Sequence, residues 1–238
     1  MTIPALIVPI LTEPERLDAL LASIDHPVGR VVVIDNGGVV DASIGGRALM
    51  PFVVHVVKPG WNLGVAASWN LGIKCWPLAP WWAVVSHDIT FGPGDLARLD
   101  AAVEPRANAV YYLNGMAAFA VTPPALHEVG WFEEGIVPAY DEDLDWQRRA
   151  RLIGTREVEV GYTGTHAGSA TIRSDPRLRA ANARSHLAND AFYAEKWGGA
   201  KDGHETFDRP WGNGRIQETR PDINRLRENT WPRKEEQA

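Results

Sequence analysis

The sequence has a single cysteine, Cys75, so it can form neither an internal disulfide bond nor a zinc site made of several thiolates. Basic residues are also in the minority, with 24 Lys and Arg against 30 Asp and Glu, a formal charge of −6 and a pI near 5.6. Because binding to duplex DNA depends mainly on neutralising phosphates, this balance argues against a nucleic-acid partner.

Long apolar runs and a targeting segment are missing as well. The start of the chain has no basic stretch, and its first apolar run, residues 5–11, is too short for a signal peptide or a membrane span. Every later candidate is interrupted by Asp, His, Lys or Pro before it reaches about 18 apolar residues. We therefore expect a cytoplasmic protein without a transmembrane segment.

The composition does supply a large core. Of the 238 residues, 45% are hydrophobic, which excludes a wholly disordered chain. From Gly198 onward the sequence becomes rich in Gly, Pro, Trp and charged residues. We expect one domain over about residues 1–200, followed by a C-terminal loop and polar tail over residues 201–238. The tail after Pro221 could reach a neighbouring subunit, so a homodimer is considered.

Short β-branched runs alternate with helical patterns in the first half of the chain. The runs are almost continuously apolar, as expected of strands buried on both faces of a sheet. This alternation predicts an α/β fold with a mostly parallel central sheet flanked by helices. Thr12 is expected to cap the first helix, since Pro14 lies in its first turn. The predicted strands are residues 5–10, 30–34, 52–57 and 82–85, and the predicted helices are residues 13–24, 62–74 and 94–103.

The pattern changes after about Glu104. Asn114-Gly115 separates two apolar runs and indicates a tight turn. Trp197 and Trp211 either stack on a sugar or pin their loop to the core, and both alternatives stay open. The predicted strands here are residues 109–113, 117–121 and 157–161, and the predicted helices follow Pro123-Pro124, span about residues 141–153 and span residues 176–197.

Small, polar and turn-forming residues follow the predicted strands. Ligands of open α/β sheets bind beyond the carboxyl ends of the strands, so these residues are candidates for a site. The fold alone would also place glycines and prolines at such turns. The residues are Pro9, Asp35-Asn36, Pro59-Gly60 and Ser86-His87-Asp88.

An acidic cluster opens the helix near residue 141. Asp141, Glu142, Asp143 and Asp145 place four acids within five residues, more than capping requires, although the helix dipole alone also stabilises acids there. The cluster lies at a loop–helix junction, where binding groups concentrate. Arg149, and Arg148 before it, could pair with Asp145 one turn away.

Two other segments point to phosphate or metal binding. Asp88 follows an apolar strand, and His166 lies between small residues, so each could reach a divalent cation. The small residues of segment 60–72 allow a nucleotide to approach the backbone at a helix start. The segment matches neither a P-loop nor the GxGxxG dinucleotide motif.

Taken in order, these segments resemble family 2 glycosyltransferases, and in particular their rhamnosyltransferase-like branch. The resemblance covers about residues 5–197 and is most specific in EDLDWQRRARLIG, residues 142–154. It implies the GT-A nucleotide-diphospho-sugar transferase fold, with a nucleotide-binding half of about residues 1–104 and an acceptor or catalytic half of about residues 105–200. It also implies an inverting hexosyl- or deoxyhexosyltransferase.

The resemblance carries roles over to single positions. Asp143 falls at the general base, and Glu142 beside it is expected to face the acceptor. Asp88 and His166 fall where a metal or the diphosphate is held, as Mn²⁺ or Mg²⁺, although Ser86 stands where the family often has an acid. The positions expected to bind the nucleotide or substrate are Pro9, Thr12, Asp35, Asn36, Asn62, Gly64, Asn70, His87 and Asp88.

This chemistry needs only one base. A cation can stabilise the departing diphosphate without a general acid, whereas a glycoside hydrolase needs a second carboxylate. The expected donor is a UDP-, GDP- or dTDP-sugar, and the expected acceptor is a glycan, a lipid-linked molecule or a protein.

Two alternatives compete with this interpretation. A GT-A module that holds a nucleotide sugar with little or no catalysis is favoured by the missing acid at Ser86. A sugar-phosphate nucleotidylyltransferase ranks lower, because the loop after the first strand, residues 9–14, has no glycine or lysine to hold a triphosphate.

Overall fold

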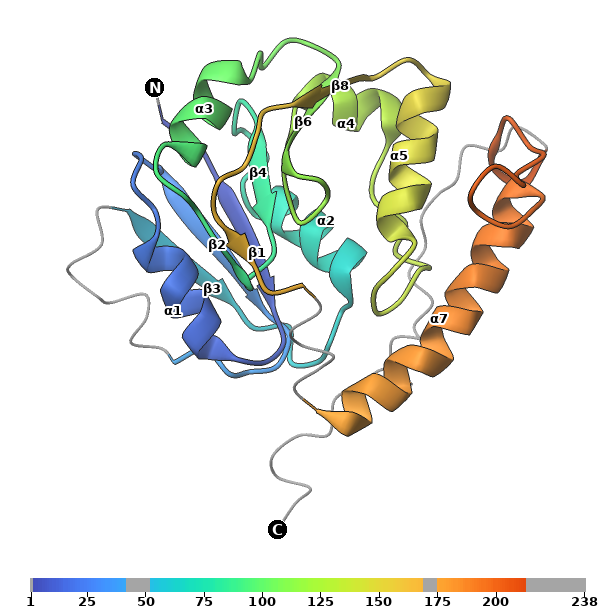
Figure 1. Ribbon diagram of the computed structural model, residues 1–238, viewed down its shortest axis with the longest axis horizontal. Helices are drawn as coiled ribbons and strands as arrows, with labels where there is room; N and C mark the ends of the chain where they lie inside the picture. The colour runs from blue at the N-terminus through green and yellow to red at the C-terminus, as the bar shows by residue number, and fades with distance from the viewer. Residues whose placement is uncertain (1, 42–51, 169–174, 213–238) are drawn as a thin grey trace.

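The computed structural model describes residues 2–41, 52–168 and 175–212 (Figure 1). Its centre is a seven-stranded sheet in the order β3-β2-β1-β4-β7-β6-β8. All neighbours pair in parallel except β7, which is antiparallel to β4 and β6. The predicted α/β class with a mostly parallel sheet is therefore confirmed. The strands are β1 (Leu6–Ile10), β2 (Arg30–Asp35), β3 (Val53–Val57), β4 (Trp82–Val85), β6 (Ala109–Asn114), β7 (Ala118–Val121) and β8 (Arg156–Glu159).

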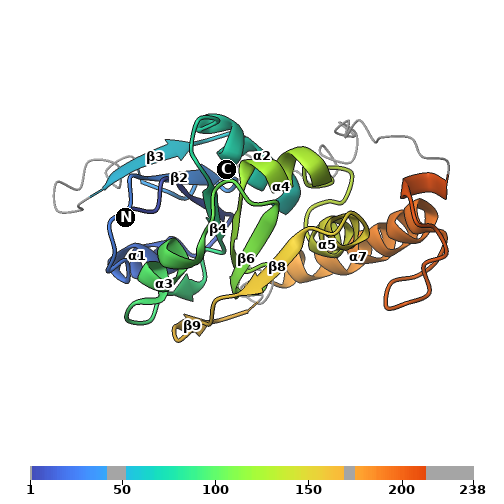
Figure 2. The same cartoon turned by 90° about the horizontal axis from the view of Figure 1, so that it is seen from above.

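Helices cover both faces of this sheet, which explains why its inner strands are continuously apolar. Leu6 and Val8 of β1 pack with α1 and α3 on one face, while Ile7 packs with α2, α4 and α5 on the other. Figure 2 shows the two layers on either side of the sheet. The helices are α1 (Pro14–Ala22), α2 (Val65–Cys75), α3 (Asp95–Ala102), α4 (Pro123–Val129) and α5 (Glu142–Leu152).

The long helix α7 (Pro176–Trp197) lies beside α5 at the outer side of the domain (Figure 1). It follows the predicted bounds, and its first buried side chain is Ser185. Trp197 is fully buried at its end, so this tryptophan pins the chain to the core. Of the predicted tail, residues 213–238 lie outside the described part of the chain. None of the described helices is both long and apolar enough to cross a membrane.

Thr12 does not cap α1, so that prediction is wrong. The residue before the helix is Glu13, in a left-handed conformation with φ of 56°, and no side chain caps this end. Glu13 leads directly into Pro14, so the cap position lies one residue beyond the predicted Thr12. The Thr12 hydroxyl is buried and has no hydrogen-bond partner among the described residues.

A second, two-stranded sheet joins distant parts of the chain. β5 (Ile89–Thr90) pairs in antiparallel fashion with β9 (Thr165–His166), with Ile89 opposite His166. This pairing brings the segment after β4 to the predicted histidine loop. The sequence did not indicate either short strand.

Candidate active site

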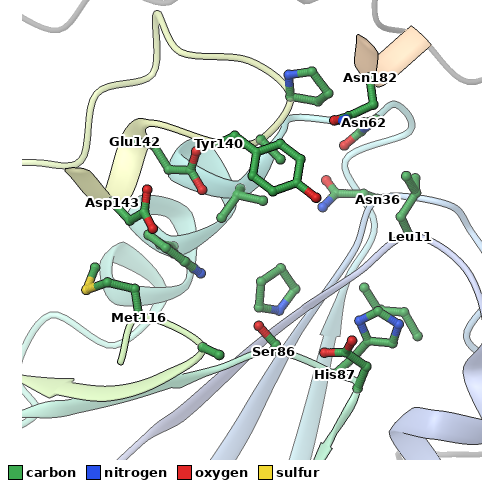
Figure 3. Close-up of a pocket in the computed structure, with 18 of the residues that line it drawn as sticks. Leu11, Asn36, Asn62, Ser86, His87, Met116, Tyr140, Glu142, Asp143 and Asn182 are labelled. Atoms are coloured by element: carbon green, nitrogen blue, oxygen red, sulfur yellow. The ribbon is translucent and has the colours of Figure 1, made fainter. Parts of the chain in front are cut away.

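A cavity of about 400 Å³ opens at the carboxyl edge of β1, β2 and β4 (Figure 3). It lies where ligands of open α/β sheets bind. The structure brings together residues from both halves of the chain around it. The predicted site residues that line it are Pro9, Asn36, Asn62, His87, Asp88, Glu142, Asp143 and His166.

The asparagines on the strand side are held rigidly. The Asn36 side chain donates to the Ser68 hydroxyl at 2.8 Å and accepts from the Leu63 backbone N–H at 3.1 Å. Asn62 accepts from the Gly64 N–H at 3.0 Å. These bonds tie the end of β2 to the start of α2 and preorganise this wall.

Asp88 and His166 form the polar floor of the cavity. The β5–β9 pairing places the Asp88 Oδ1 and His166 Nε2 atoms 3.4 Å apart. Two ligands of one divalent ion lie roughly 3 Å apart when each is about 2.1 Å from the metal. An oxygen and a nitrogen donor at this separation fit a divalent cation, and the nitrogen favours Mn²⁺ over Mg²⁺.

His87, between Ser86 and Asp88, faces the same cavity. Its Nε2 atom is buried and has no hydrogen-bond partner among the described residues. Burial favours the neutral imidazole and lowers the pKa of His87. The nearby Asp88 carboxylate has the opposite, smaller effect.

A second group of His and Asp side chains, away from Asp88 and His166, is already neutralised by a lysine. Ligand atoms of Asp141, His186 and Asp190 lie within 4.8 Å of one another. The Lys201 ammonium, however, contacts Asp141 at 2.7 Å and Asp190 at 2.9 Å. It supplies the positive charge that a metal would bring there.

Glu142 and Asp143 enter the cavity from the first turn of α5 (Figure 3). Burial raises the pKa of Glu142 well above its ordinary value, and the neighbouring Asp143 charge adds to this. One Glu142 oxygen has no hydrogen-bond partner among the described residues. Burial also raises the pKa of Asp143, although its Oδ1 accepts from the Leu144 N–H at 2.9 Å. Each carboxyl is thus a better proton acceptor than a solvated one.

The loop that leads into α5 is strained and clamped. Tyr140 and Asp141 have φ of 73° and 76°, a left-handed conformation that costs about 1 kcal/mol or more per non-glycine residue. The buried Asn189 side chain of α7 accepts from the Val137 N–H and donates to the Ala139 and Tyr140 carbonyls, at 2.9–3.2 Å. These bonds hold the loop that aims Glu142 and Asp143.

The start of α2 touches the same loop. Gly64 has φ of 83°, and a Cβ there would lie 2.8 Å from the Pro138 carbonyl oxygen. Its successor Val65 donates its N–H to that oxygen at 2.7 Å. Only glycine permits this contact, which closes the cavity between α2 and α5.

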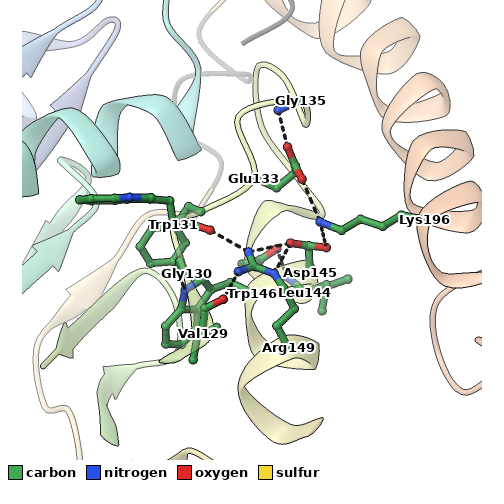
Figure 4. Close-up of polar contacts among 12 residues, drawn as sticks. Val129, Gly130, Trp131, Glu133, Gly135, Leu144, Asp145, Trp146, Arg149 and Lys196 are labelled. Atoms are coloured by element: carbon green, nitrogen blue, oxygen red, sulfur yellow. Dashed lines mark hydrogen bonds and ion pairs between the residues drawn. The ribbon is translucent and has the colours of Figure 1, made fainter. Parts of the chain in front are cut away.

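An ion network centred on the buried Asp145 and Lys196 fixes α5 to α7 (Figure 4). The Asp145 carboxylate contacts Arg149 at 2.8 Å, as predicted, and Lys196 at 2.7 Å. Arg148, the other predicted partner, instead contacts the Phe207 carbonyl and Glu205. Lys196 also binds Glu133 at 2.8 Å, and the Trp197 indole donates to Asp145 at 3.0 Å. Burial alone would raise the pKa of Asp145, but Arg149 and Lys196 outweigh it and hold that pKa below its ordinary value.

Four predicted residues do not line the cavity. Asp35 accepts from the Val39 and Val40 N–H groups, and Asn70 donates to the Phe132 carbonyl and the Glu134 carboxylate. These contacts shape the loops around the cavity. The four residues are Thr12, Asp35, Gly64 and Asn70, and their contacts with a nucleotide stay predictions.

Several lining residues were missed from sequence. Met116 lies in the turn between β6 and β7, and Tyr140 lies in the clamped loop. Leu178, Ala181 and Asn182 come from α7. The Asn-Gly turn and the long helix were recognised, but nothing in their local pattern shows that they border the site.

Comparison with solved structures identifies the fold. S. aureus TarS 1–349 matches with a TM-score of 0.52 and 14% identity, over 82% of this chain and 71% of that chain. A Drosophila β1,4-galactosyltransferase 7 mutant, in complex with manganese, UDP-Gal and xylobiose, matches with a TM-score of 0.50 and 14% identity, over 71% of this chain and 72% of that chain. The sequence matches no protein-family model and no curated protein. This chain therefore has the α/β architecture of GT-A glycosyltransferases, and its place in the family 2 branch stays a prediction.

Proposed function

We propose that this protein is an inverting glycosyltransferase that moves a sugar from a nucleotide-sugar donor to an acceptor hydroxyl. The observation that carries the proposal is one cavity at the carboxyl edge of a GT-A sheet, with Asp143 on one wall and the Asp88–His166 pair on its floor. The solved TarS and galactosyltransferase complexes contain UDP and UDP-Gal, respectively, which supports a nucleotide-sugar donor.

In this mechanism Asp143 takes the proton of the acceptor hydroxyl. The acceptor oxygen forms a bond to the anomeric carbon while the bond from that carbon to the diphosphate oxygen breaks, and the diphosphate leaves with the electron pair. Attack from the face opposite the diphosphate inverts the anomeric centre. Glu142, beside Asp143 in the first turn of α5, would orient the acceptor through a hydrogen bond.

The charges around the cavity favour a divalent cofactor. Asp88, Glu142 and Asp143 line the cavity, and no lysine or arginine among the described residues does so. A diphosphate would meet carboxylates without a compensating side-chain cation other than a histidine. A divalent ion held by Asp88 and His166 would, when bound, stabilise the negative charge of the departing diphosphate.

The direct test is turnover of a panel of UDP-, GDP- and dTDP-sugars with 1 equivalent to excess Mn²⁺ or Mg²⁺, read as release of nucleoside diphosphate. We expect release, by transfer or slow hydrolysis, with at least one donor. Chelation with EDTA should lower the rate by about 10-fold or more, and Asp88→Asn should weaken the response to added Mn²⁺. A rate that EDTA leaves unchanged would contradict the proposed cofactor.

A nucleotide-sugar-binding module is the second candidate. Ser86 lines the cavity where an acid would provide a further metal ligand, and this favours binding with weak catalysis. Calorimetric binding of a donor with no nucleoside diphosphate released would support this candidate over the enzyme.

The loop clamp predicts a positioning role for Asn189. Asn189→Ala should lower the free energy of unfolding by about 1–3 kcal/mol, because it leaves buried backbone groups of the loop without partners. It should also lower kcat by about 10-fold while changing the donor KM less, since the loop before α5 would no longer hold Asp143 in the position needed to accept the proton. Ser185→Ala is the control, because within the described part of the chain the Ser185 hydroxyl bonds to carbonyls of its own helix and to no other group. Equal kinetic effects of the two variants would refute the role.

A further inference from the structure

One face of α7 is turned toward the loop that leads into α5. Asn182, His186 and Asn189 follow one another at intervals of four and three residues, so they lie on one face of the helix. Asn189 clamps the loop, and the His186 ring packs edge-to-face on the Tyr140 ring, with 5.7 Å between centroids. One turn earlier on the same face, the Asn182 side chain lines the cavity itself. The helix face that holds the loop therefore continues into the wall of the site.

Asn182 lies on the nucleotide side of the cavity. Figure 3 places it next to Asn62, across the cavity from Met116 and Asp143. Asn62 belongs to the wall at the start of α2, which is tied to the end of β2. In the same view the Tyr140 ring lies between Asp143 and the two asparagines. We refer to the side chains of Asn62 and Asn182 as the amide pair.

The amide pair has hydrogen-bonding groups that the described part of the chain does not use. The Asn62 oxygen accepts from the Gly64 N–H at 3.0 Å, which leaves the amide NH₂ group of Asn62 as a donor. The half-buried Asn182 side chain makes no hydrogen bond to the described residues. The pair therefore offers a ligand two uncharged donor groups and one carbonyl acceptor from opposite segments of the chain.

Tyr140 is held beside the amide pair at an energetic cost. Its backbone φ of 73° is a strained conformation for an aromatic residue, and such strain is concentrated at ligand sites, where the surrounding structure fixes it. Here Asn189 and His186 of α7 supply that fixation. An aromatic ring packs on the apolar face of a sugar ring, while amide groups bind the hydroxyls at its edge. Tyr140 and the amide pair together fit such a ring.

The identity of this sugar ring follows from the proposed mechanism. The transferred sugar must lie between Asp143 and the diphosphate at Asp88 and His166, and the acceptor hydroxyl must lie at Asp143. The other sugar ring of a nucleotide-sugar donor is the ribose, which joins the diphosphate at the end away from the transferred sugar. Because the amide pair lies across the cavity from Asp143, the ribose is the ring that it fits.

We propose that Asn182 of α7, together with Asn62, binds the 2′- and 3′-hydroxyls of the donor ribose, with the Tyr140 ring against the sugar. This inference rests on the proposed function, and it adds a specificity-determining residue from α7 to the same site. A site that pairs with a hydroxyl rejects the analogue that lacks it, because its own polar groups are then left unpaired. Among the donors considered above, the pair therefore favours UDP- or GDP-sugars over dTDP-sugars.

The test compares ribonucleotides with their 2′-deoxy analogues on the full chain. Calorimetry in the presence of Mn²⁺ measures the Kd of UDP, 2′-deoxy-UDP, GDP and 2′-deoxy-GDP. UDP or GDP should bind at least about 10-fold more tightly than its own 2′-deoxy analogue. Equal affinities within both pairs of nucleotides would overturn the inference.

Variants of Asn182 locate the preference. Asn182→Leu keeps the approximate size of the side chain but removes its amide, and it should reduce the ratio of ribo- to deoxynucleotide affinity to about 3-fold or less. Asn182→Asp should keep the ratio, because a carboxylate also accepts from ribose hydroxyls. The matched control is Ala183→Leu, which introduces the same leucine at an exposed position outside the cavity and should leave the ratio unchanged. A full ratio in Asn182→Leu would also overturn the inference.

Binding and turnover separate this inference from the proposed function. Donor turnover together with a ratio that Asn182→Leu does not change would reject the role of Asn182 and retain the glycosyltransferase. A ratio that Asn182→Leu abolishes, without release of nucleoside diphosphate from any donor, would retain the ribose site and reject the enzyme. No binding of any of the four nucleotides would reject both.

Discussion

Replacing Asp143 with asparagine is expected to lower the rate of sugar transfer by about 10²–10⁴-fold, the usual contribution of a general base. Asparagine keeps the size of the side chain and its hydrogen bond from the Leu144 N–H, but it cannot accept the acceptor proton. The Kd of the nucleotide sugar should stay within a few fold, because the proposed diphosphate site at Asp88 and His166 does not include Asp143. Steady-state transfer assays and calorimetry measure the two effects.

Glu128→Gln provides the control for this variant. Glu128 lies exposed on α4 beside His127, away from the cavity, and its replacement removes the same charge. It should leave transfer unchanged. A transfer rate for Asp143→Asn equal to that of the control would remove Asp143 from the mechanism.

The pH dependence gives a second readout of the same residue. Burial raises the pKa of Asp143, so the proton stays on this carboxyl to a higher pH than on a solvated aspartate. Only the deprotonated form can act as base, so kcat should fall as the pH is lowered through the raised pKa. The acid limb of the profile should disappear from the residual activity of Asp143→Asn.

Lys196→Met is expected to cost about 3–5 kcal/mol of the free energy of unfolding, the largest stability effect that we predict. Lys196 has no exposed surface and binds both Glu133 and Asp145, so its loss leaves buried carboxylates without their cation. Chemical denaturation followed by circular dichroism measures the change. Because α7 also carries the loop clamp, the variant should lose activity below its own unfolding midpoint.

Lys74→Met is the matched control for the ion network. Lys74 is 52% exposed and lies 3.9 Å from Glu134, so its replacement should change stability by no more than about 1 kcal/mol. Equal losses for the two variants would show that the buried network contributes no more than a surface pair.

The pKa of Asp145 is held low in the folded state, so its stabilising contribution is present at neutral pH and is lost as the pH falls through that pKa.

Local sequence predicted most of the fold because its signals are short-range. Continuous apolar runs marked β1, β2 and β4, and the 3.6-residue spacing of Leu17, Leu20 and Leu21 marked α1. The ends of parallel strands meet at one edge, and this rule brought Pro9, Asn36 and Asp88 to one cavity. The acidic helix start and Asp88 were found from residue type and position alone.

Contacts between distant segments could not be predicted in this way. Asn189 reads as an ordinary polar residue of a helix, yet it clamps a loop about 50 positions earlier in the chain. Lys196 reads as a solvated lysine near a helix end, yet it is fully buried between two acids. β5 and β9 have two residues each, so neither has a periodicity that a sequence could reveal.

The two ends of the long helix α7 make different contacts. Its last three turns, with Asn189, Lys196 and Trp197, anchor the domain, while its first two turns only border the cavity. Substitutions in the first two turns should therefore change the stability of the fold little, whereas those in the last three turns should destabilise it. The lining of the cavity could therefore change at one end of this helix while the anchoring end is preserved.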